Sequence, residues 1–326
     1  MTRVPRPGPD VFEALGFDVP LGPFAAYTVG GSADILFSPQ GEDELIEGLD
    51  WAYSNVLPTF VLGSGTNLLI RDGGVRGLVV YLGPQTRSWH LRVIERDADS
   101  LLVRVPGAFS KAELLEWSLE NGCEGLEFSA GIPGTMGGAV FMNAGTRWGS
   151  YANVIESVRI WVPGEGPVEK NVADMGFRYR GHGDGALAHW SVVLTADLRL
   201  KISKDPEASR SLVDRILSYR GSRQALERPS CGSVFKNPEN STRGAGRLIE
   251  SAALKGTRRG GAQLSTKHAN FLLNRGNATA ADIEELILFT QRRVKEEFGI
   301  QLEPEVIVVG RAQRLEEEVY ALREGA

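Results

Sequence analysis

The stretch from Gly125 to Gly145, GLEFSAGIPGTMGGAVFMNAG, most constrains what this chain can fold into. Its 21 residues hold six glycines and a single ionisable side chain, Glu127. A segment with so few side chains to pack must act through its backbone, and glycine lets main-chain N–H groups approach a ligand closely. Successive N–H groups in such a loop can form a concave anion site. A purely structural glycine-rich loop is the alternative interpretation.

A second loop favours the anion site. In VLGSGTNLLI, from Val61 to Ile70, an apolar strand runs into Gly63–Asn67 and back into apolar residues. Two loops rich in N–H donors suit a ligand with several phosphates, and we expect Gly65 to leave room where the backbone meets them. Neither loop ends in the Gly-Lys-Ser/Thr of a P-loop, and neither fits the G-x-G-x-x-G fingerprint. The two commonest nucleotide folds are excluded, but a nucleotide is not.

Composition narrows the class of protein. Glycine makes up 39 of 326 residues, about 12% against an average near 7%. The net charge of −5 offers no basic surface to nucleic acid. No apolar run approaches the roughly 18 residues of a membrane span, and the N-terminal segment lacks the apolar core of a secretory signal. Cys123 and Cys231 match no metal spacing. We expect a cytoplasmic protein without a metal, a membrane or a nucleic-acid partner.

The periodicity of the chain predicts strands and helices in alternation after Tyr27. The expected strands are 33–38, 60–62, 78–82, 91–95, 101–105, 155–162, 191–200 and 304–309. The expected helices are 42–53, 110–121, 209–220, 281–298 and 313–323. Ser110 and Thr279 are suited to cap the starts of two of these helices, and Gly299 is suited to end one.

Three short segments carry side chains suited to catalysis or binding. In CGSVFKNP, Ser233 enters a short apolar strand; the alternative is an ordinary polar loop, and no G-x-S-x-G elbow surrounds the serine. In FRYRG, Arg180 suits recognition of a carboxylate or phosphate, unless it lies on a solvated strand face. In LEPEV, Glu305 follows a proline at the start of an apolar strand, and an exposed ion pair is its alternative. His268 is a ligand-contact candidate, and the four histidines show no metal spacing.

These segments together resemble one family. TVGGSADI, GSGTNLLI, GIPGTMGGAVFMNAG, YRG, GSVFKNP, AGRLIESAALKG, GGAQLSTKHANFLLN and LEPEV occur in the order in which the UDP-N-acetylenolpyruvoylglucosamine reductases carry them. Each motif is weak alone, but eight in order are specific, and they cover the chain from about Phe24 to Gly310. The short interval between Arg180 and Ser233 resembles the shorter subclass of the family.

The resemblance implies an α+β fold. It consists of a two-lobed FAD-binding domain of the vanillyl-alcohol-oxidase (PCMH) type and a C-terminal α+β domain that binds the substrate. The implied division is an N-terminal segment at 1–21, the FAD-binding domain at 22–208 with lobes of about 22–82 and 83–208, the substrate-binding domain at 209–311, and a C-terminal tail at 312–326.

The resemblance also implies the reaction. NADPH reduces a non-covalent FAD, leaves, and is replaced by UDP-N-acetylglucosamine-enolpyruvate. Hydride passes from flavin N5 to C3 of the enol ether and a proton goes to C2, which yields UDP-N-acetylmuramate for peptidoglycan synthesis. Ser233 is implied as the proton donor, and Arg180 and Glu305 as the groups that stabilise the enolate. We expect the enzyme to be a monomer.

The implied binding residues form two sets. The FAD contacts are Tyr27, Gly63, Ser64, Gly65, Thr66, Asn67, Leu68, Gly131, Ile132, Pro133, Gly134, Thr135, Gly137, Gly138, Asn143 and Ala144. The substrate contacts are Tyr179, Gly232, Lys236, Asn237, Gln263, His268 and Asn270.

Some positions depart from the family pattern. Ile307 stands where many members have an arginine that helps to bind substrate, Gly181-His182-Gly183 follows Arg180 where relatives have a serine, and Thr146-Arg147-Trp148 replaces a turn with a tyrosine. Two other functions remain open from the residues: an FAD-dependent oxidase of sugars or alcohols, and a non-enzymatic sensor of nucleotide sugars. A visible flavin spectrum would separate the sensor from both enzymes.

Overall fold

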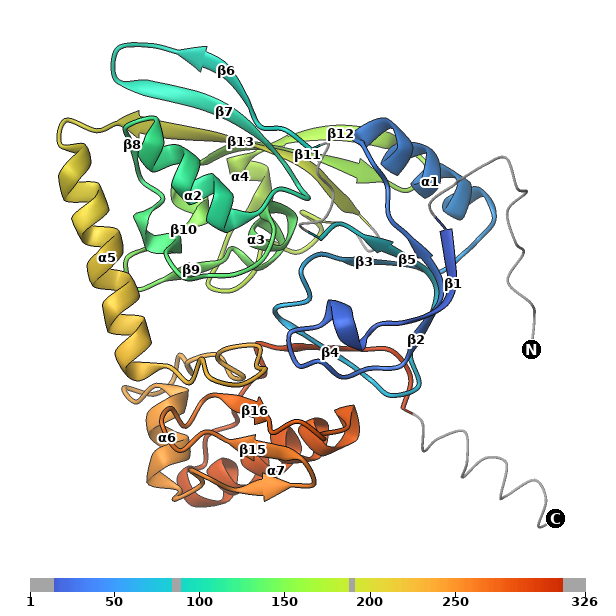
Figure 1. Cartoon of the computed structure of the whole chain (residues 1–326), viewed down its shortest axis with the longest axis vertical. Coiled ribbons are helices and arrows are strands. Elements are labelled where there is room, and N and C mark those ends of the chain that lie inside the picture. Colours follow the sequence, from blue (N-terminus) through green and yellow to red (C-terminus); the bar gives the residue numbers. More distant parts are fainter. Residues whose placement is uncertain (1–14, 84–88, 188–190, 313–326) are drawn as a thin grey trace. The chain divides into compact units, whose positions relative to one another are not determined.

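The computed structural model describes residues 15–83, 89–187 and 191–312 (Figure 1). The predicted tail helix at 313–323 and most of the N-terminal segment lie outside these residues. The chain forms two compact units. Unit 1 takes in the chain up to Gly16, Leu36–Ser64 and Gly77–Arg220, and unit 2 takes in Phe17–Ile35, Gly65–Arg76 and the chain from Gly221 onward. In the described part of the chain, no helix has the length and apolar character needed to cross a membrane.

Most strands and helices of the described residues are short, and the longest are α1, α5, α7 and β13. The strands are β1 (Leu15–Pro20), β2 (Ser32–Phe37), β3 (Thr59–Leu62), β4 (Leu68–Ile70), β5 (Val75–Tyr81), β6 (Arg92–Arg96), β7 (Ser100–Pro106), β8 (Cys123–Glu124), β9 (Gly145–Thr146), β10 (Gly149–Ser150), β11 (Ile155–Val162), β12 (Gly166–Asn171), β13 (Val192–Ile202), β14 (Arg258–Arg259), β15 (Ala262–Leu264), β16 (Leu272–Asn274) and β17 (Ile307–Val309). The α-helices are α1 (Glu42–Ser54), α2 (Lys111–Glu120), α3 (Met136–Met142), α4 (Val172–Met175), α5 (Pro206–Arg223), α6 (Ala245–Ser251) and α7 (Ala280–Phe298).

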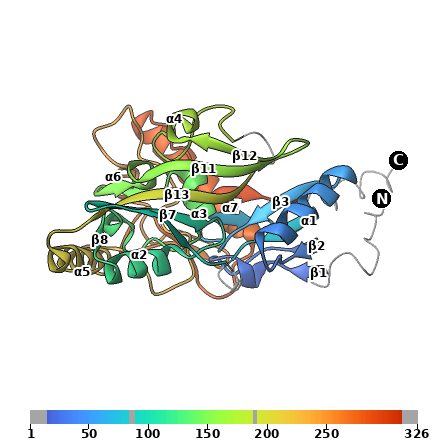
Figure 2. The same ribbon diagram turned by 90° about the horizontal axis from the view of Figure 1, so that it is seen from above.

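Unit 1 is built on an antiparallel sheet. Its described strands follow the order β12-β11-β13-β7-β6, and β8 pairs with one end of β13. β13 is the longest strand and is buried over most of its length, with Thr195 opposite Pro106 on one side and Arg159 on the other. Helices α2 and α3 lie against one face of this sheet (Figures 1 and 2).

Strand alternation explains how unit 1 closes its core. On β7, Leu101, Val103 and Val105 are buried while the residues between them are only half-buried, because successive side chains point to opposite faces. The buried set joins Leu114, Met136 and the other members of one apolar cluster. On the opposite face, Arg104 of β7 forms a bidentate ion pair with Asp197 of β13, at 2.7 and 2.8 Å.

Unit 2 packs the antiparallel sheet β14-β15-β16 against α7. The predicted apolar face of α7 is confirmed, since Ile283, Leu286, Ile287 and Val294 are all buried. These residues share a core with Val234, Phe235 and parts of β4 and α6. A separate parallel pair joins β17 to β4, with Val308 opposite Leu69.

Several boundaries between the two units fall inside β-strands. A four-stranded sheet has the order β1-β2-β5-β3, and the parallel pair β3–β5 places Val61 opposite Val80. The division of the chain falls inside β1, β2 and β5. The glycine-rich segment 63–67 is divided in the same way, between Ser64 and Gly65.

Most predicted elements are confirmed, some with bounds moved by one to three residues. The Ser110 side chain accepts a hydrogen bond from the N–H of Glu113, and Thr279 forms a capping box with Asp282. Gly299 ends α7 with a φ of +68°. The strand predicted over 304–309 is too long, because Pro304 and Glu305 pair with the segment around Val234 and only Ile307–Val309 continues as β17.

The glycine-rich stretch contains a helix that its composition did not predict. Gly137 and Gly138 disfavour a helix by up to about 1 kcal/mol each relative to alanine. Nevertheless α3 forms there and buries Met136, Ala139 and Val140 in the core of unit 1. The packing of these three side chains outweighs the low intrinsic propensity.

The start of α7 provides a test of the fold of unit 2. The Asp72 carboxylate accepts hydrogen bonds from the N–H groups of Ala280 (2.9 Å) and Ala281 (3.0 Å). Asp72→Ala should lower the free energy of unfolding by about 1–3 kcal/mol, because it leaves two helix N–H groups without their charged partner. Asp214→Ala, at an exposed position of α5, should change it little. Urea unfolding measures both, and equal stabilities would contradict this role.

Candidate functional site

Main-chain N–H groups without protein partners mark both glycine-rich loops. Among the described residues, the N–H groups of 63–67 donate to no acceptor of the chain, nor do those of Gly134, Thr135 and Gly138. Of these residues, Gly65 and Thr135 are buried, Gly138 is exposed and the others are half-buried, so most of the donors can be reached from outside the chain. The loops therefore present a set of donors to a ligand.

The start of the first loop, at Gly63 and Ser64, adjoins the second loop within unit 1. A Cβ built on Gly63 would lie 2.7 Å from Thr135 Oγ1, and one built on Gly138 would lie 3.9 Å from the same atom. Thr135 is buried at this contact. The donors of Gly63, Ser64, Thr135 and Gly138 are thus close together, which suits the oxygens of a diphosphate. This cradle fits the FAD that the sequence predicts.

Gly65 is required by the fold of the chain around it. Its φ is +60°, and a Cβ there would lie 2.1 Å from the carbonyl oxygen of Phe24. The chain itself therefore excludes a side chain at this position. A larger residue would therefore disturb the fold of unit 2 as well as any bound cofactor.

The remaining predicted FAD residues differ in accessibility. Ile132 is half-buried, while Gly131 and Pro133 are exposed. Tyr27 is fully buried in the core of unit 2, where burial raises the pKa of its hydroxyl. Leu68 belongs to β4. The main chain at Gly137 and Ala144 is engaged within unit 1, by hydrogen bonds to Gly107 O and Ala139 O.

Arg180 lies at the corner of a strained turn. Arg178 and Gly181 exchange backbone hydrogen bonds in both directions, so Tyr179 and Arg180 form a two-residue corner. Arg180 has a φ of +55°, which at the second corner position of such a turn is normally left to glycine or asparagine. A non-glycine residue held there costs on the order of 1–3 kcal/mol. Strain of this kind often marks a functional residue.

The turn is anchored by the glycine-rich segment. The buried amide of Asn143 donates to Arg178 O at 3.0 Å and accepts from the Ala152 N–H at 3.1 Å. The Arg180 guanidinium donates to Gly145 O at 2.8 Å and lies 5.0 Å from the ring centre of Tyr179, which is about half exposed. Asn143 thus positions the turn that carries Arg180.

Ser233 and Glu305 are brought together by backbone pairing in unit 2. Ser233 forms a bridge with Phe271, and the Glu305 N–H donates to the carbonyl of the next residue, Val234, at 2.7 Å. The side chain of Asn67 donates to Glu305 O at 2.9 Å. Two residues 72 positions apart in the sequence therefore share one short ladder.

Three predicted substrate residues form hydrogen bonds within unit 2, and one of them, Asn270, holds the ladder. The buried amide of Asn270 both accepts from Phe235 N (3.0 Å) and donates to Phe235 O (2.8 Å). Gln263 is buried and bonds Gly256 O and Arg275. Asn237 accepts from the N–H of Ala245, at the start of α6.

The other predicted substrate residues are more open. Lys236 forms an ion pair with Glu303 at 2.6 Å, and Gly232 has a φ of +76°. His268 is half-buried, and its ring lies edge-on to Phe271 with 4.8 Å between centres. Burial and, to a lesser degree, the charge of Lys255 lower the pKa of His268, so the imidazole is largely neutral near pH 7.

One residue near the site was missed from the sequence. Lys111 is the first residue of α2, and it is only 5% exposed. Its N–H donates to Gly134 O in the glycine-rich loop at 3.0 Å. A cation at a helix N-terminus is unfavourable, and that mismatch was the available signal.

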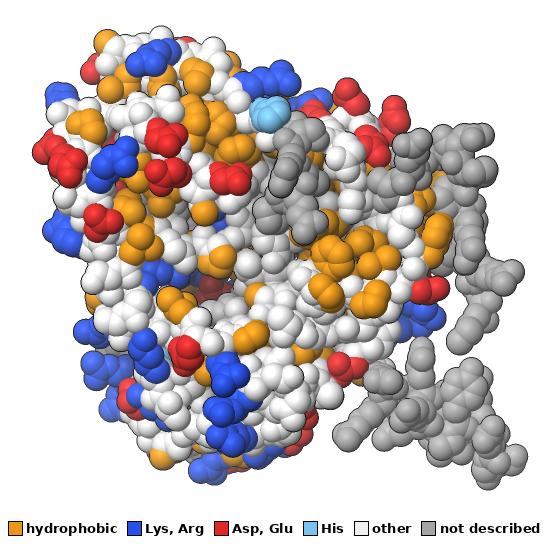
Figure 3. Space-filling model, viewed as in Figure 1, with side chains coloured by type: hydrophobic (Ala, Val, Ile, Leu, Met, Phe, Trp, Pro, Cys, Tyr) orange, Lys and Arg blue, Asp and Glu red, His pale blue; other side chains and the backbone are white. Residues whose placement is uncertain are grey.

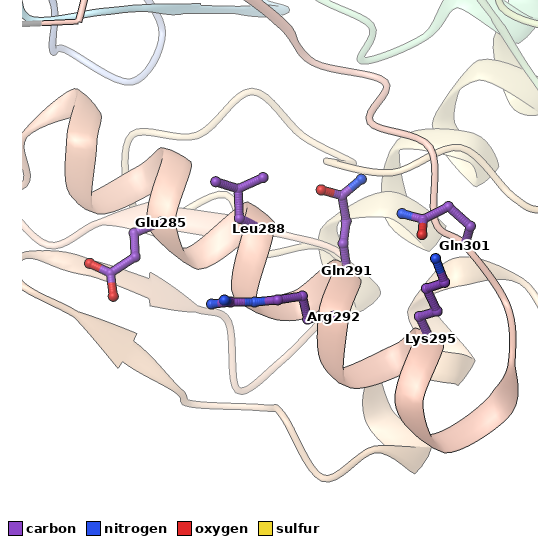
Figure 4. A pocket seen from close by; sticks show the side chains of 6 residues that line it. All are labelled: Glu285, Leu288, Gln291, Arg292, Lys295 and Gln301. Atoms are coloured by element: carbon purple, nitrogen blue, oxygen red, sulfur yellow. The ribbon is translucent and has the colours of Figure 1, made fainter. Parts of the chain in front are cut away.

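A pocket elsewhere on unit 2 does not coincide with these residues. It lies along α7 and is lined by Glu285, Leu288, Gln291, Arg292, Lys295 and Gln301 (Figure 4). No group of three potential metal ligands occurs in the part of the chain that the structure describes. On the face drawn in Figure 3, Lys and Arg side chains over unit 1 are interspersed with acidic ones.

Comparison with known proteins defines first the class and then the family. Residues 33–170 match the model of an FAD binding domain, so the chain is a flavoprotein. Residues 224–309 match the C-terminal domain model of UDP-N-acetylenolpyruvoylglucosamine reductase. The chain belongs to the UDP-N-acetylenolpyruvoylglucosamine reductase family, and it is an FAD-dependent oxidoreductase with an α+β fold.

Individual relatives agree along almost the whole chain. The UDP-N-acetylenolpyruvoylglucosamine reductase of Moorella thermoacetica is 43% identical over 89% of this chain and 92% of its own length. The protein of the same name from Synechococcus sp. (strain RCC307) is 40% identical, over 90% and 93%. The crystal structure of the Thermus caldophilus enzyme superposes with a TM-score of 0.73 at 32% identity, over 91% of this chain and 98% of that one. This membership decides against the oxidase and the sensor.

The cradle in unit 1 can be tested through cofactor affinity. Gly63→Ala should raise the dissociation constant of FAD about tenfold or more, because the new Cβ pushes Thr135 away and overpacking of this kind costs about 1–3 kcal/mol. Gly221→Ala is the matched control, since no atom lies within 4 Å of its Cβ position. Fluorescence titration of the apoprotein measures both affinities. Wild-type affinity in Gly63→Ala would place the diphosphate elsewhere.

The backbone strain at Arg180 can be tested through the free energy of unfolding. Arg180→Ala and Arg180→Gly both remove the guanidinium contacts, so they differ in the backbone alone. Arg180→Gly should have a free energy of unfolding about 1 kcal/mol higher than that of Arg180→Ala, because glycine adopts the left-handed φ without strain. At Arg178, which has no positive φ, the glycine variant should instead be about 0.5–1 kcal/mol less stable than the alanine variant. Denaturant unfolding measures both pairs, and an Arg180→Gly variant no more stable than Arg180→Ala would show that the turn is not strained.

Proposed function

We propose that Ser233, Arg180 and Glu305 carry the second half of an NADPH-dependent reduction of UDP-N-acetylglucosamine-enolpyruvate. The protein is a reductase of peptidoglycan precursor synthesis, and it uses FAD with NADPH as the electron donor. The observation that supports the assignment of residues most strongly is the backbone ladder that joins Ser233 and Glu305 through Val234. Their roles follow from the chemistry of each side chain.

The cofactor would be held mainly by main-chain donors. The N–H groups around Gly63 and Thr135 would bind the diphosphate, and the loop that continues to Gly138 would lie along the rest of the molecule. Bound FAD supplies the hydride that adds to C3 of the enol ether. The protein contributes position and electrostatics, as is general for cofactor enzymes.

Addition of hydride at C3 leaves negative charge at C2, spread onto the neighbouring carboxylate as an enolate. Ser233 would donate its hydroxyl proton to C2, so that hydride and proton together saturate the double bond. A serine is a weak acid toward water but sufficient toward a carbanion-like centre. The ladder to Phe271 and Glu305 fixes the backbone on which this hydroxyl stands.

Arg180 and Glu305 would stabilise the enolate. The guanidinium of Arg180 is suited to pair with the substrate carboxylate through a bidentate fork. Glu305 in its neutral form would donate a hydrogen bond to the enolate oxygen. Donors aimed at the place where charge develops are typically the largest single contribution to catalysis. The cost of holding Arg180 at positive φ is consistent with such a demand.

Domain organisation, assembly and location complete the proposal. The FAD-binding domain would take in residues 22–208 and the substrate-binding domain 209–311, and Tyr179, Gly232, Lys236, Asn237 and His268 would contact the substrate. We place the enzyme in the cytoplasm, where NADPH and nucleotide sugars are available, and as a monomer. Light scattering of the holoenzyme tests the oligomeric state, and a dimer mass would contradict it.

The role of Ser233 predicts different effects on the two half-reactions. Ser233→Ala should bind FAD and be reduced by NADPH at close to the wild-type rate, because that step needs no proton from the serine. Reoxidation by the enolpyruvyl substrate should slow by about 10²–10⁴ or more, the usual effect of removing a proton donor. Anaerobic stopped-flow absorbance at the flavin band separates the two steps.

Two further variants serve as controls. Ser233→Cys should recover part of the lost rate, since a thiol can also deliver a proton, while Ser218→Ala at an exposed position of α5 should behave as wild type. Equal slowing of both half-reactions in Ser233→Ala would indicate a structural role. An unchanged second half-reaction would assign the proton to another group.

A further inference from the structure

A buried ammonium group adjoins the glycine-rich loop of unit 1. Lys111 is 5% exposed, and among the described residues its Nζ has neither an ion pair nor a hydrogen bond. Its backbone is tied to the loop by the hydrogen bond to Gly134 O and by the bridge between Ser110 and Thr135. Burial of most of the side chain disfavours the charged amine, so an anion that reaches Lys111 would stabilise its protonated form.

The charges that act on Lys111 most strongly are both positive. They belong to Arg180, on the turn after α4, and to Arg220, at the end of α5. Both guanidiniums donate to carbonyls that border the same glycine-rich segment, Arg180 to Gly145 O at 2.8 Å and Arg220 to Gly131 O at 2.9 Å. Three cations from three separate elements therefore surround one stretch of chain.

In the part of the chain that the structure describes, the charges that act on Lys111 most strongly include no acidic group, and Glu113, Glu116 and Glu120 of α2 are all exposed. The loop and helix from Gly131 to Met142 carry no ionisable side chain. Burial first, and then the charges of Arg180 and Arg220, lower the pKa of Lys111 to about 7. Near neutral pH the amine is therefore about half protonated before an anion arrives.

We propose that Lys111, together with Arg180 and Arg220, forms an anion subsite for a diphosphate-bearing ligand behind the 131–135 loop, and that Lys111 takes up a proton when that anion binds. This rests on the proposed position of the cofactor at that loop. Three ligands of the enzyme carry a diphosphate: FAD, NADPH and the nucleotide-sugar substrate. All three are anions of the same chemistry, and the measurement below distinguishes them.

The proposal has a defined effect on the ligand-free protein. The pKa of Lys111 is lower in the folded than in the unfolded chain, so between about pH 7 and pH 10.5 the unfolded chain binds more protons. The stability of the apoprotein should therefore gain from this residue as the pH rises through that window. Lys111→Met removes the gain and should be at least as stable as wild type at pH 7.

Calorimetry in buffers of different ionisation enthalpy counts the protons. For FAD binding to wild-type apoprotein at pH 7.5, in HEPES and in Tris, we expect an uptake of about 0.5–1 proton per FAD, because a pKa of about 7 leaves most of the amine unprotonated beforehand. Lys111→Met should show no uptake and a dissociation constant raised about tenfold or more, the usual effect of losing a charge-assisted contact. Lys111→Arg should bind without uptake, since arginine is always charged.

A matched control and a second titration complete the experiment. Lys170→Met, at a more open position of unit 1, should retain both uptake and affinity. The second arm consists of two separate titrations of the FAD-loaded enzyme, one with UDP-N-acetylglucosamine-enolpyruvate and one with NADP+. Uptake confined to one of these titrations assigns the anion to that ligand. The proposal would be overturned if wild type took up no proton in either arm. It would also be overturned if Lys111→Met took up as many protons as wild type.

The Gly63→Ala variant and the proton count together show whether the role of Lys111 or the proposed cofactor site is wrong. If Gly63→Ala binds FAD as tightly as wild type, the cradle is misplaced whatever Lys111 does. If FAD affinity responds to Gly63→Ala but no proton is taken up by wild type, the cradle stands and Lys111 is only a packing residue. The wild-type comparison between buffers gives this answer even if Lys111→Met does not fold.

Discussion

The arrangement around the proposed cofactor site follows from main-chain N–H groups that have no acceptor among the described residues. The loops at 63–67 and 131–138 expose such donors, and the elements around them hold the loops in place. Thr135 lies against Gly63, Gly137 bonds to Gly107, and α3 is anchored through Met136 in the core. A ligand that supplies oxygens would give these donors their acceptors.

The proposed binding groups and the proposed catalytic groups are held in place in different ways. The donors of the cradle belong to backbone whose side chains are small, whereas Ser233 and Glu305 stand on a ladder held by the buried amide of Asn270. Arg180 is held at positive φ by a turn that Asn143 anchors. In each case a buried amide fixes the backbone that carries a functional side chain. Positioning of this kind is what precise geometry at an active site requires.

Local patterns predicted much of the fold and less of the site. The apolar periodicity and the Thr279 cap located α7 within one residue, because both signals act within one helix. The ladder between Val234 and Glu305, and the commitment of Asn270 and Gln263 to backbone and side-chain partners, depend on contacts far apart in sequence and were not predictable from it. Lys111 was missed because burial is a tertiary property, and α3 because core packing overrode the propensity of its glycines.

Hydrogen exchange of the backbone amides tests the central claim most directly. Peptides that cover 63–67 and 131–138 would be compared in the apoprotein and in the FAD-loaded protein, by mass spectrometry or NMR. If these N–H groups bind the cofactor, the amides of Ser64, Thr135 and Gly138 should exchange at least about tenfold more slowly with FAD bound. Unchanged exchange in both loops, in a protein that retains its full flavin content, would contradict the account.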